Sequence, residues 1–188
     1  MLRHPCRRRA HCRPGTGGRT VEPMSFDVAA EAYDRFMGRY SSPLSPQLAG
    51  LAGLHTGHRA LDVGCGPGAL TAELAARRGP EAVTAVDPSG PFVEAARARH
   101  PGVTVLEAPA EQLPFGDGTF DAALAQLVVH FMKDPVRGLA EMKRVTRRAG
   151  IVVACVWDYG AGQDPLRAFW RAARELDPGV HDESRLAG

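Results

Sequence analysis

The chain has 188 residues, of which 44% are hydrophobic and 23% are charged, and its formal net charge is +2. This length is enough for one sizeable domain with its own core, and no run approaches the roughly 18 apolar residues that a membrane span needs. Residues 1–23 hold six arginines and one acid, which leaves a net charge of −3 on the rest of the chain. A nucleic-acid-binding face on the folded part is therefore not expected.

Residues 1–23 are predicted to be a disordered, arginine-rich extension. They lack the apolar segment of a secretory signal, and the alternative interpretation is a basic arm that binds nucleic acid. His4, Cys6, His11 and Cys12 match none of the usual spacings of a structural zinc site, so no metal is predicted. The cysteines of the chain form no disulfide framework, which favours a reducing, cytoplasmic setting.

Residues 24–188 are predicted to form one domain that opens with two helices. Ser25 is a suitable N-cap, and apolar residues on one face extend the first helix to Gly38, which can end it. Residues 41–43, Ser-Ser-Pro, are predicted to separate this helix from a second one that carries leucines at spacings of three and four.

Strands and helices are then predicted to alternate. Short apolar runs bounded by glycine and proline indicate strands at residues 60–63, 82–86, 103–106, 120–126 and 151–157. Helices are predicted at residues 69–78, 91–99, 135–146 and 165–176. This order indicates an α/β fold, a Rossmann-like doubly wound parallel sheet with helices on both faces. Ligands of such sheets bind beyond the carboxyl ends of the strands.

The glycine-rich turn after the first strand, residues 64–68, predicts a cofactor site. Gly64, Gly66 and Ala69 satisfy the dinucleotide pattern, and Asp87 lies 21 residues after Gly66, which suits an NAD(P)-dependent oxidoreductase. Other features favour a different cofactor. Asp62 stands inside a buried strand, Pro67 removes an N–H that a pyrophosphate could use, and the segment from Ala110 to Phe115 offers an apolar wall for an adenine ring.

Five ordered segments carry a resemblance to a known family. The segments LDVGCGPG (61–68), VDPS (86–89), AEQLPF (110–115), FDAALAQLVVHFMKDP (120–135) and EMKRV (141–145) resemble the class I S-adenosylmethionine-dependent methyltransferases. The most similar branch acts on small molecules and includes ubiquinone/menaquinone methyltransferases. The resemblance covers about residues 26–158. It implies S-adenosylmethionine as cofactor and transfer of its methyl group to a small-molecule acceptor by in-line displacement.

The resemblance also implies a set of cofactor-binding residues: Asp62, Gly64, Cys65, Gly66, Asp87, Pro88, Ala110, Glu111 and Gln126. Asp62 and Gly64 are expected at the methionine amino group, and Gly66 lets the backbone pass close to the cofactor. Asp87 is expected to accept the ribose hydroxyls. Ala110 and Glu111 are expected to flank the adenine, and Gln126 to face the methionine moiety.

Other residues near the predicted site have weaker assignments. Cys65 is expected to be a small turn residue and not a nucleophile, because no base is evident beside it. His130 is the candidate base for an acceptor that must lose a proton, and its alternative is a packing histidine. Tyr33 and Arg39 on the first helix could cover the site, with Arg39 pairing to the cofactor carboxylate.

The chain departs from the family pattern in three places. Residues 147–150 replace a proline-glycine-glycine turn, and Pro109 stands where an acid is often found. No strand hairpin is predicted after residues 151–157, so that apolar strand is expected to form an exposed edge and to favour self-association. A C-terminally incomplete, non-catalytic relative of the family is therefore a further alternative.

Overall fold

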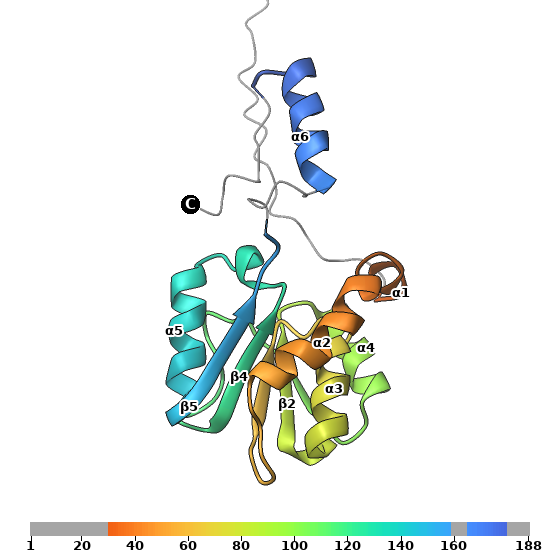
Figure 1. The fold of residues 1–188 in the computed structure, drawn as a ribbon. Helices are drawn as coiled ribbons and strands as arrows, with labels where there is room; N and C mark the ends of the chain where they lie inside the picture. The colour runs from red at the N-terminus through yellow and green to blue at the C-terminus, as the bar shows by residue number, and fades with distance from the viewer. Residues whose placement is uncertain (1–29, 159–164, 180–188) are drawn as a thin grey trace, which may run out of the picture.

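A computed structural model describes residues 30–158 and 165–179 (Figure 1). Its centre is a five-stranded sheet with the order β3-β2-β1-β4-β5, in which all pairings are parallel. The strands are β1 (Ala60–Val63), β2 (Val83–Asp87), β3 (Thr104–Glu107), β4 (Phe120–Gln126) and β5 (Thr146–Cys155). The predicted parallel α/β sheet is confirmed. The predicted extension at residues 1–23 lies outside the described residues.

Helices lie between successive strands except between β3 and β4, and others precede β1 and follow β5. They are α1 (Ala30–Tyr33), the π-helix η1 (Asp34–Gly38), α2 (Arg39–Leu51), α3 (Ala69–Arg78), α4 (Gly90–Arg99), α5 (Pro135–Val145) and α6 (Pro165–Leu176), with 3₁₀ turns η2 (Pro80–Ala82) and η3 (Val129–Phe131). Helices α2, α3 and α4 lie on one face, and α5 lies on the other (Figure 1). No helix in the described part of the chain is long and apolar enough to cross a membrane.

The alternation of side chains along β1 divides the core into two clusters. Ala60 belongs to the cluster that packs under α2, α3 and α4. Leu61 and Val63 point to the other face, where they meet Met142 and Val145 of α5. Because successive strand residues face opposite sides, a strand that is buried on both faces needs a continuous apolar run, and a polar residue within it requires a separate explanation.

The predicted break between two N-terminal helices is wrong. Residues 30–51 are helical throughout, because α1, η1 and α2 follow one another directly. Pro43 and Pro46 lie within α2, where each removes one backbone hydrogen bond. The carbonyls that lose a donor four residues earlier belong to Arg39 and Ser42, which are exposed, so water can replace the missing partner.

The prediction for the fifth strand is wrong at both ends. β5 begins at Thr146, ends at Cys155, and contains an irregularity opposite Phe120 and Ala122. Within it Ala149 adopts a left-handed backbone with φ of 63°. Among the described residues β5 pairs only with β4, and no further strand follows it. Ile151 and Val152 are exposed on this edge, as the sequence predicts.

Candidate functional site

Three polar residues of the predicted site lie toward the carboxyl ends of adjacent strands. Asp62 is in β1, Asp87 ends β2, and Gln126 ends β4. β1 is paired with both β2 and β4, so the three residues share one edge of the sheet. β2 and β3 lie on one side of β1 in the sheet, whereas β4 and β5 lie on the other side. This reversal of the strand order creates the crevice in which doubly wound folds bind ligands.

Asp62 is a buried carboxyl group with one oxygen left unpaired. Its residue is 1% exposed, and Oδ2 accepts a hydrogen bond from Thr71 Oγ1 at 2.7 Å. Oδ1 has no hydrogen-bond partner among the described residues. Burial raises the pKa of Asp62 to about 7, and the nearby Asp87 contributes to this rise. Thr71 was not predicted to contribute to the site, because the sequence indicates only that it lies in the first turn of a helix.

Asp87 joins the glycine-rich turn to the turn after β2. Its Oδ2 accepts from Gly66 N at 2.8 Å, and its Oδ1 accepts from Ser89 N at 2.9 Å. Burial raises the pKa of Asp87, while these two hydrogen bonds act in the opposite direction. Each carboxylate oxygen has a second lone pair, so Asp87 retains capacity to accept from a diol. Pro88 follows it and is exposed.

The backbone N–H groups of residues 64–68 are all hydrogen-bonded within the protein. Gly64 N and Cys65 N both donate to Val86 O, Gly66 N donates to Asp87, and Gly68 N donates to Cys65 O. Pro67 has no N–H. The turn therefore has no unused backbone donor at these five positions, unlike a loop that cradles a pyrophosphate through its N–H groups.

Two glycines of this turn are required by protein packing. At Gly64, φ is 71° and an added Cβ would lie 2.3 Å from Val128 Cγ2. At Gly68, φ is 103° and an added Cβ would lie 2.3 Å from His100 Nε2. Gly66 differs, because its nearest neighbour, Tyr33 Cε1, would be 3.9 Å away. The roles of Val128 and His100 carry no signal in the sequence, because they arise from contacts between distant segments.

The N-terminal helices reach over the site edge at Gln126 and Gly66. Gln126 Nε2 donates to Ser41 O at 3.1 Å, and its Oε1 is buried with no hydrogen-bond partner in the described residues. The ring of Tyr33 packs 5.0 Å from that of Phe92. Burial raises the pKa of Tyr33, with a contribution from Asp87. Tyr33 therefore lies near Gly66 and Asp87, and its covering role stays a prediction.

Arg39 does not point toward Asp62 or Asp87 in the structure. Its Nε donates to Phe36 O at 3.2 Å, and its guanidinium lies 5.7 Å from the Tyr40 ring centre. The pairing of Arg39 with a cofactor carboxylate stays a prediction.

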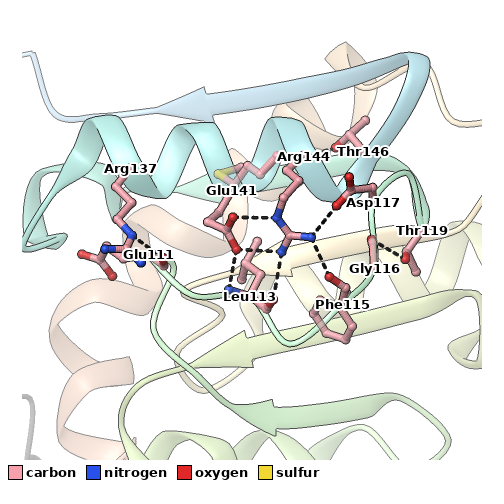
Figure 2. Close-up of polar contacts among 11 residues, drawn as sticks. Glu111, Leu113, Phe115, Gly116, Asp117, Thr119, Arg137, Glu141, Arg144 and Thr146 are labelled. Atoms are coloured by element: carbon pink, nitrogen blue, oxygen red, sulfur yellow. Dashed lines mark hydrogen bonds and ion pairs between the residues drawn. The ribbon is translucent and has the colours of Figure 1, made fainter.

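Ala110 and Glu111 lie in the connection between β3 and β4, on the α5 side of the sheet. Ala110 is buried in the cluster that α5 covers. Glu111 Oε1 accepts from Asp134 N at 3.1 Å, and Glu111 O accepts from Arg137 Nε at 3.0 Å (Figure 2). The position of Glu111 is thus fixed by the first turn of α5 and by the residue before it.

Burial shifts the pKa values of Cys65 and His130 in opposite directions. Burial raises the pKa of the Cys65 thiol well above its usual value, so Cys65 is a neutral thiol and a poor nucleophile. His130 lies in η3, with its ring 4.0 Å from that of Phe131. Burial lowers its pKa, which favours the neutral imidazole that a base requires.

A hollow of about 320 Å³ adjoins the glycine-rich turn on the side of η1 and α2. Arg99 and Asp34 on its wall form an ion pair, with Nη1 and Oδ2 2.6 Å apart. Its lining residues are Asp34, Gly38, Ser42, Pro67, Gly68, Ala69, Arg99 and His100. The hollow was not predicted, because it depends on how η1 and α2 pack against α3 and α4.

The fold and this edge define a Rossmann-like protein with a cofactor-type site at its first strand–helix turn. Residues 61–154 match the family described as methyltransferase domain. The chain belongs to this family, and the predicted resemblance is confirmed.

Individual relatives agree with this placement. The chain is 33% identical over 148 residues to malonyl-[acyl-carrier protein] O-methyltransferase of Pectobacterium atrosepticum, which covers 79% of this chain and 57% of that protein. It is 35% identical over 108 residues to the ubiquinone/menaquinone biosynthesis C-methyltransferase UbiE of Citrifermentans bemidjiense, covering 54% of this chain and 46% of that protein. The chain thus spans about half the length of these curated relatives.

A solved structure shows the same fold. It is described as a SAM-dependent methyltransferase, possible histamine N-methyltransferase, from Thermotoga maritima. The TM-score is 0.59 at 28% sequence identity, and the match covers 78% of this chain and 65% of that one.

Proposed function

We propose that this chain binds S-adenosylmethionine at the carboxyl ends of β1, β2 and β4 and transfers its methyl group to a small-molecule acceptor. The observation that carries the proposal is the buried Asp62 carboxyl group, whose Oδ1 has no hydrogen-bond partner among the described residues. A buried carboxylate is costly unless it is paired. An ammonium group of a ligand is the partner that this position lacks.

The surroundings of Asp62 disfavour binding of a dinucleotide. Asp62 and Asp87 are both buried and close enough to raise the pKa of Asp62, so a pyrophosphate placed beside them would meet two like charges. The N–H groups of residues 64–68 are already bonded within the chain, which removes the donors that would offset this repulsion. The NAD(P)-dependent alternative is not favoured.

Each residue of the proposed site has a defined task. Asp62 pairs with the methionine amino group, and Thr71 holds its other oxygen in place. Asp87 accepts the ribose hydroxyls while its hydrogen bonds to Gly66 and Ser89 fix its orientation. Ala110 and Glu111 flank the adenine. Gln126 Oε1, which is unpaired among the described residues, accepts from the methionine amino group.

When bound, the cofactor supplies a methyl group attached to a sulfonium sulfur. The leaving group is then a neutral thioether, so no acid is needed to assist its departure. The protein then contributes alignment and exclusion of water. A base is needed only where the acceptor loses a proton, and His130 is the residue that we propose for it. The names of the two curated relatives refer to methylation of an oxygen and of a carbon, and both acceptor types belong in the test.

Isothermal titration calorimetry with S-adenosylhomocysteine and with NAD tests the binding proposal. We expect binding of the first ligand and none of the second. Asp87→Asn and Glu81→Gln are compared as a matched pair. We expect the first to weaken binding of S-adenosylhomocysteine and the second to leave it unchanged, because Glu81 is exposed in η2, before the amino end of β2. Binding of NAD with no binding of S-adenosylhomocysteine would contradict the proposal.

An activity assay then separates an enzyme from a non-catalytic relative. Transfer of a labelled methyl group from S-adenosylmethionine to a panel of phenols, quinols and amines is measured. Binding of the cofactor with no transfer to any member would favour the non-catalytic alternative.

We also propose two points about the organisation of the chain. The first is that the functional unit extends beyond the matched residues 61–154 and includes the N-terminal helices. The second is that the β5 edge associates with a second copy of the chain. Gln126 and Ser41 link α2 to the site, which supports the first statement. The exposed Ile151 and Val152 on β5 support the second, because an exposed apolar edge strand favours pairing with another chain.

A further inference from the structure

Two residues of α5, Glu141 and Arg144, form a bidentate ion pair. Arg144 Nε donates to Glu141 Oε1 at 2.6 Å, and Arg144 Nη2 donates to Glu141 Oε2 at 2.7 Å (Figure 2). Hydrogen bonds from Arg144 hold the pKa of Glu141 below its usual value. Two such bonds fix the orientation of both side chains more firmly than a single contact does.

The same two side chains also contact residues 108–118, the connection between β3 and β4. Leu113 N donates to Glu141 Oε2 at 3.0 Å, and Leu113 O accepts from Arg144 Nη2 at 3.1 Å. Arg144 Nη1 donates to Phe115 O at 2.8 Å and to the side chain of Asp117 at 2.9 Å. The connection has no helix or strand, so side chains supply the backbone partners that regular structure would provide.

Both ends of α5 contact this connection. Near the start of the helix, Asp134 N and Arg137 Nε donate to Glu111. Toward the end of the helix, Glu141 and Arg144 hold Leu113, which is buried in the core. Figure 2 shows the contact of Arg137 and those of Glu141 and Arg144 along one side of the helix. Ala110 and Glu111, the residues proposed to flank the adenine, therefore lie next to a main-chain segment that α5 holds in place.

We propose that Glu141 and Arg144 are positioning residues for adenine recognition, which they support through the main chain of Leu113. The inference rests on the proposed function. Hydrogen bonds weaken steeply as distance and angle depart from their optimum, so a connection that is free to shift would lose discrimination between similar bases. The segment at 141–145 thereby gains a role that the sequence alone did not assign to it.

The test compares two ligands that differ only at the base. S-adenosylhomocysteine carries adenine, and S-inosylhomocysteine carries hypoxanthine in its place. For the wild-type chain, we expect calorimetry to show at least about tenfold tighter binding of the adenine ligand, because an unmatched buried hydrogen-bonding group is costly. For Arg144→Ala, we expect about tenfold weaker binding of S-adenosylhomocysteine and a smaller change for S-inosylhomocysteine. The ratio of the two affinities should therefore fall toward one.

Arg147→Ala is the matched control. Arg147 also forms an ion pair, but with Asp121 near the amino end of β4, away from residues 110–113. We expect the ratio of the two affinities to stay at its wild-type value in this variant. A general loss of stability would weaken both ligands alike and leave the ratio unchanged, so the ratio separates positioning from folding.

Arg144→Lys is measured where Arg144→Ala does not fold. Lysine keeps the positive charge but not the planar fork, so we expect the ratio to fall here too. An unchanged ratio in a folded Arg144 variant, or equal binding of the two ligands by the wild-type chain, overturns the inference and leaves the proposed function standing. A wild-type chain that binds neither ligand overturns both.

Discussion

Asp62 shows how one residue can indicate the kind of ligand that a site takes. The other residues of β1 are apolar and buried, and each packs into one of the two core clusters. Asp62 belongs to neither cluster, and only one of its carboxylate oxygens has a hydrogen-bond partner, Thr71, among the described residues. A polar group kept at this cost inside a strand is more readily explained by ligand binding than by stability.

We predict that the stability of the ligand-free chain depends on pH through Asp62. Burial raises the pKa of the folded chain's Asp62 from 3.8 to about 7, so between these values the folded state holds a proton that the unfolded state has lost. The contribution of Asp62 is therefore fully present below about pH 4 and is lost as pH rises toward 7. Relative to Asp62→Asn, the wild-type chain should lose on the order of 3 kcal/mol of unfolding free energy between about pH 5 and pH 8.

Urea denaturation of the two chains over this pH range measures the effect. Thr71→Val provides a second check, because the Thr71 hydroxyl lowers the pKa of Asp62 and its removal should move the pH window upward. A difference between wild type and Asp62→Asn that is constant with pH would show that Asp62 is ionised throughout.

The first half of β5 contains two adjacent backbone positions that both favour glycine, of which only one holds it. Ala149 adopts φ of 63°, a conformation that costs a residue with a side chain roughly 1–2 kcal/mol. At the next residue, Gly150, an added Cβ would lie 2.6 Å from Asp121 O. The resemblance places a glycine-containing turn here, and the structure explains why one glycine is needed and another would be preferred.

We predict that Ala149→Gly stabilises the chain and that Gly150→Ala destabilises it. The first change relieves the left-handed strain and adds some unfolded-state entropy, for a net gain of about 0.5–1 kcal/mol. The second forces a side chain against backbone and should cost about 2 kcal/mol or more. Chemical denaturation of both variants gives the two free energies, and a loss of stability in Ala149→Gly would contradict the assigned backbone conformation.

The sheet as a whole has two unequal edges. At one end β3 is short, while at the other β5 spans ten residues and carries exposed apolar side chains. Unpaired backbone groups along a long apolar edge favour pairing with another chain. This arrangement is a property of the whole sheet, because it depends on the strand order and not on β5 alone.

We predict that this edge makes the chain self-associate. Val152→Lys should shift the chain toward a monomer in size-exclusion chromatography with light scattering, because a lysine on an edge strand opposes pairing. Val136→Lys is the matched control, since Val136 is an exposed valine of α5, 80% exposed and away from the edge. A thermally stable monomeric wild-type chain would contradict the prediction.

The sequence by itself determined the type of each strand and helix of the α/β fold and their order along the chain. β1, β4, α3 and α6 have the predicted bounds, because apolar runs, helical periodicity and glycine or proline boundaries are local signals. The positions of Asp62, Asp87 and Gln126 at one edge also followed from the sequence, since the carboxyl ends of parallel strands lie together.

Only the tertiary structure decided the contacts between distant segments. The continuous helix at residues 30–51, the packing of Val128 on Gly64, and the contacts of α5 with Leu113 depend on partners far away in the sequence. The raised pKa of Asp62 has the same origin, because burial and the proximity of Asp87 exist only in the folded chain. Local patterns specify which elements form, whereas packing decides which polar groups are left for a ligand.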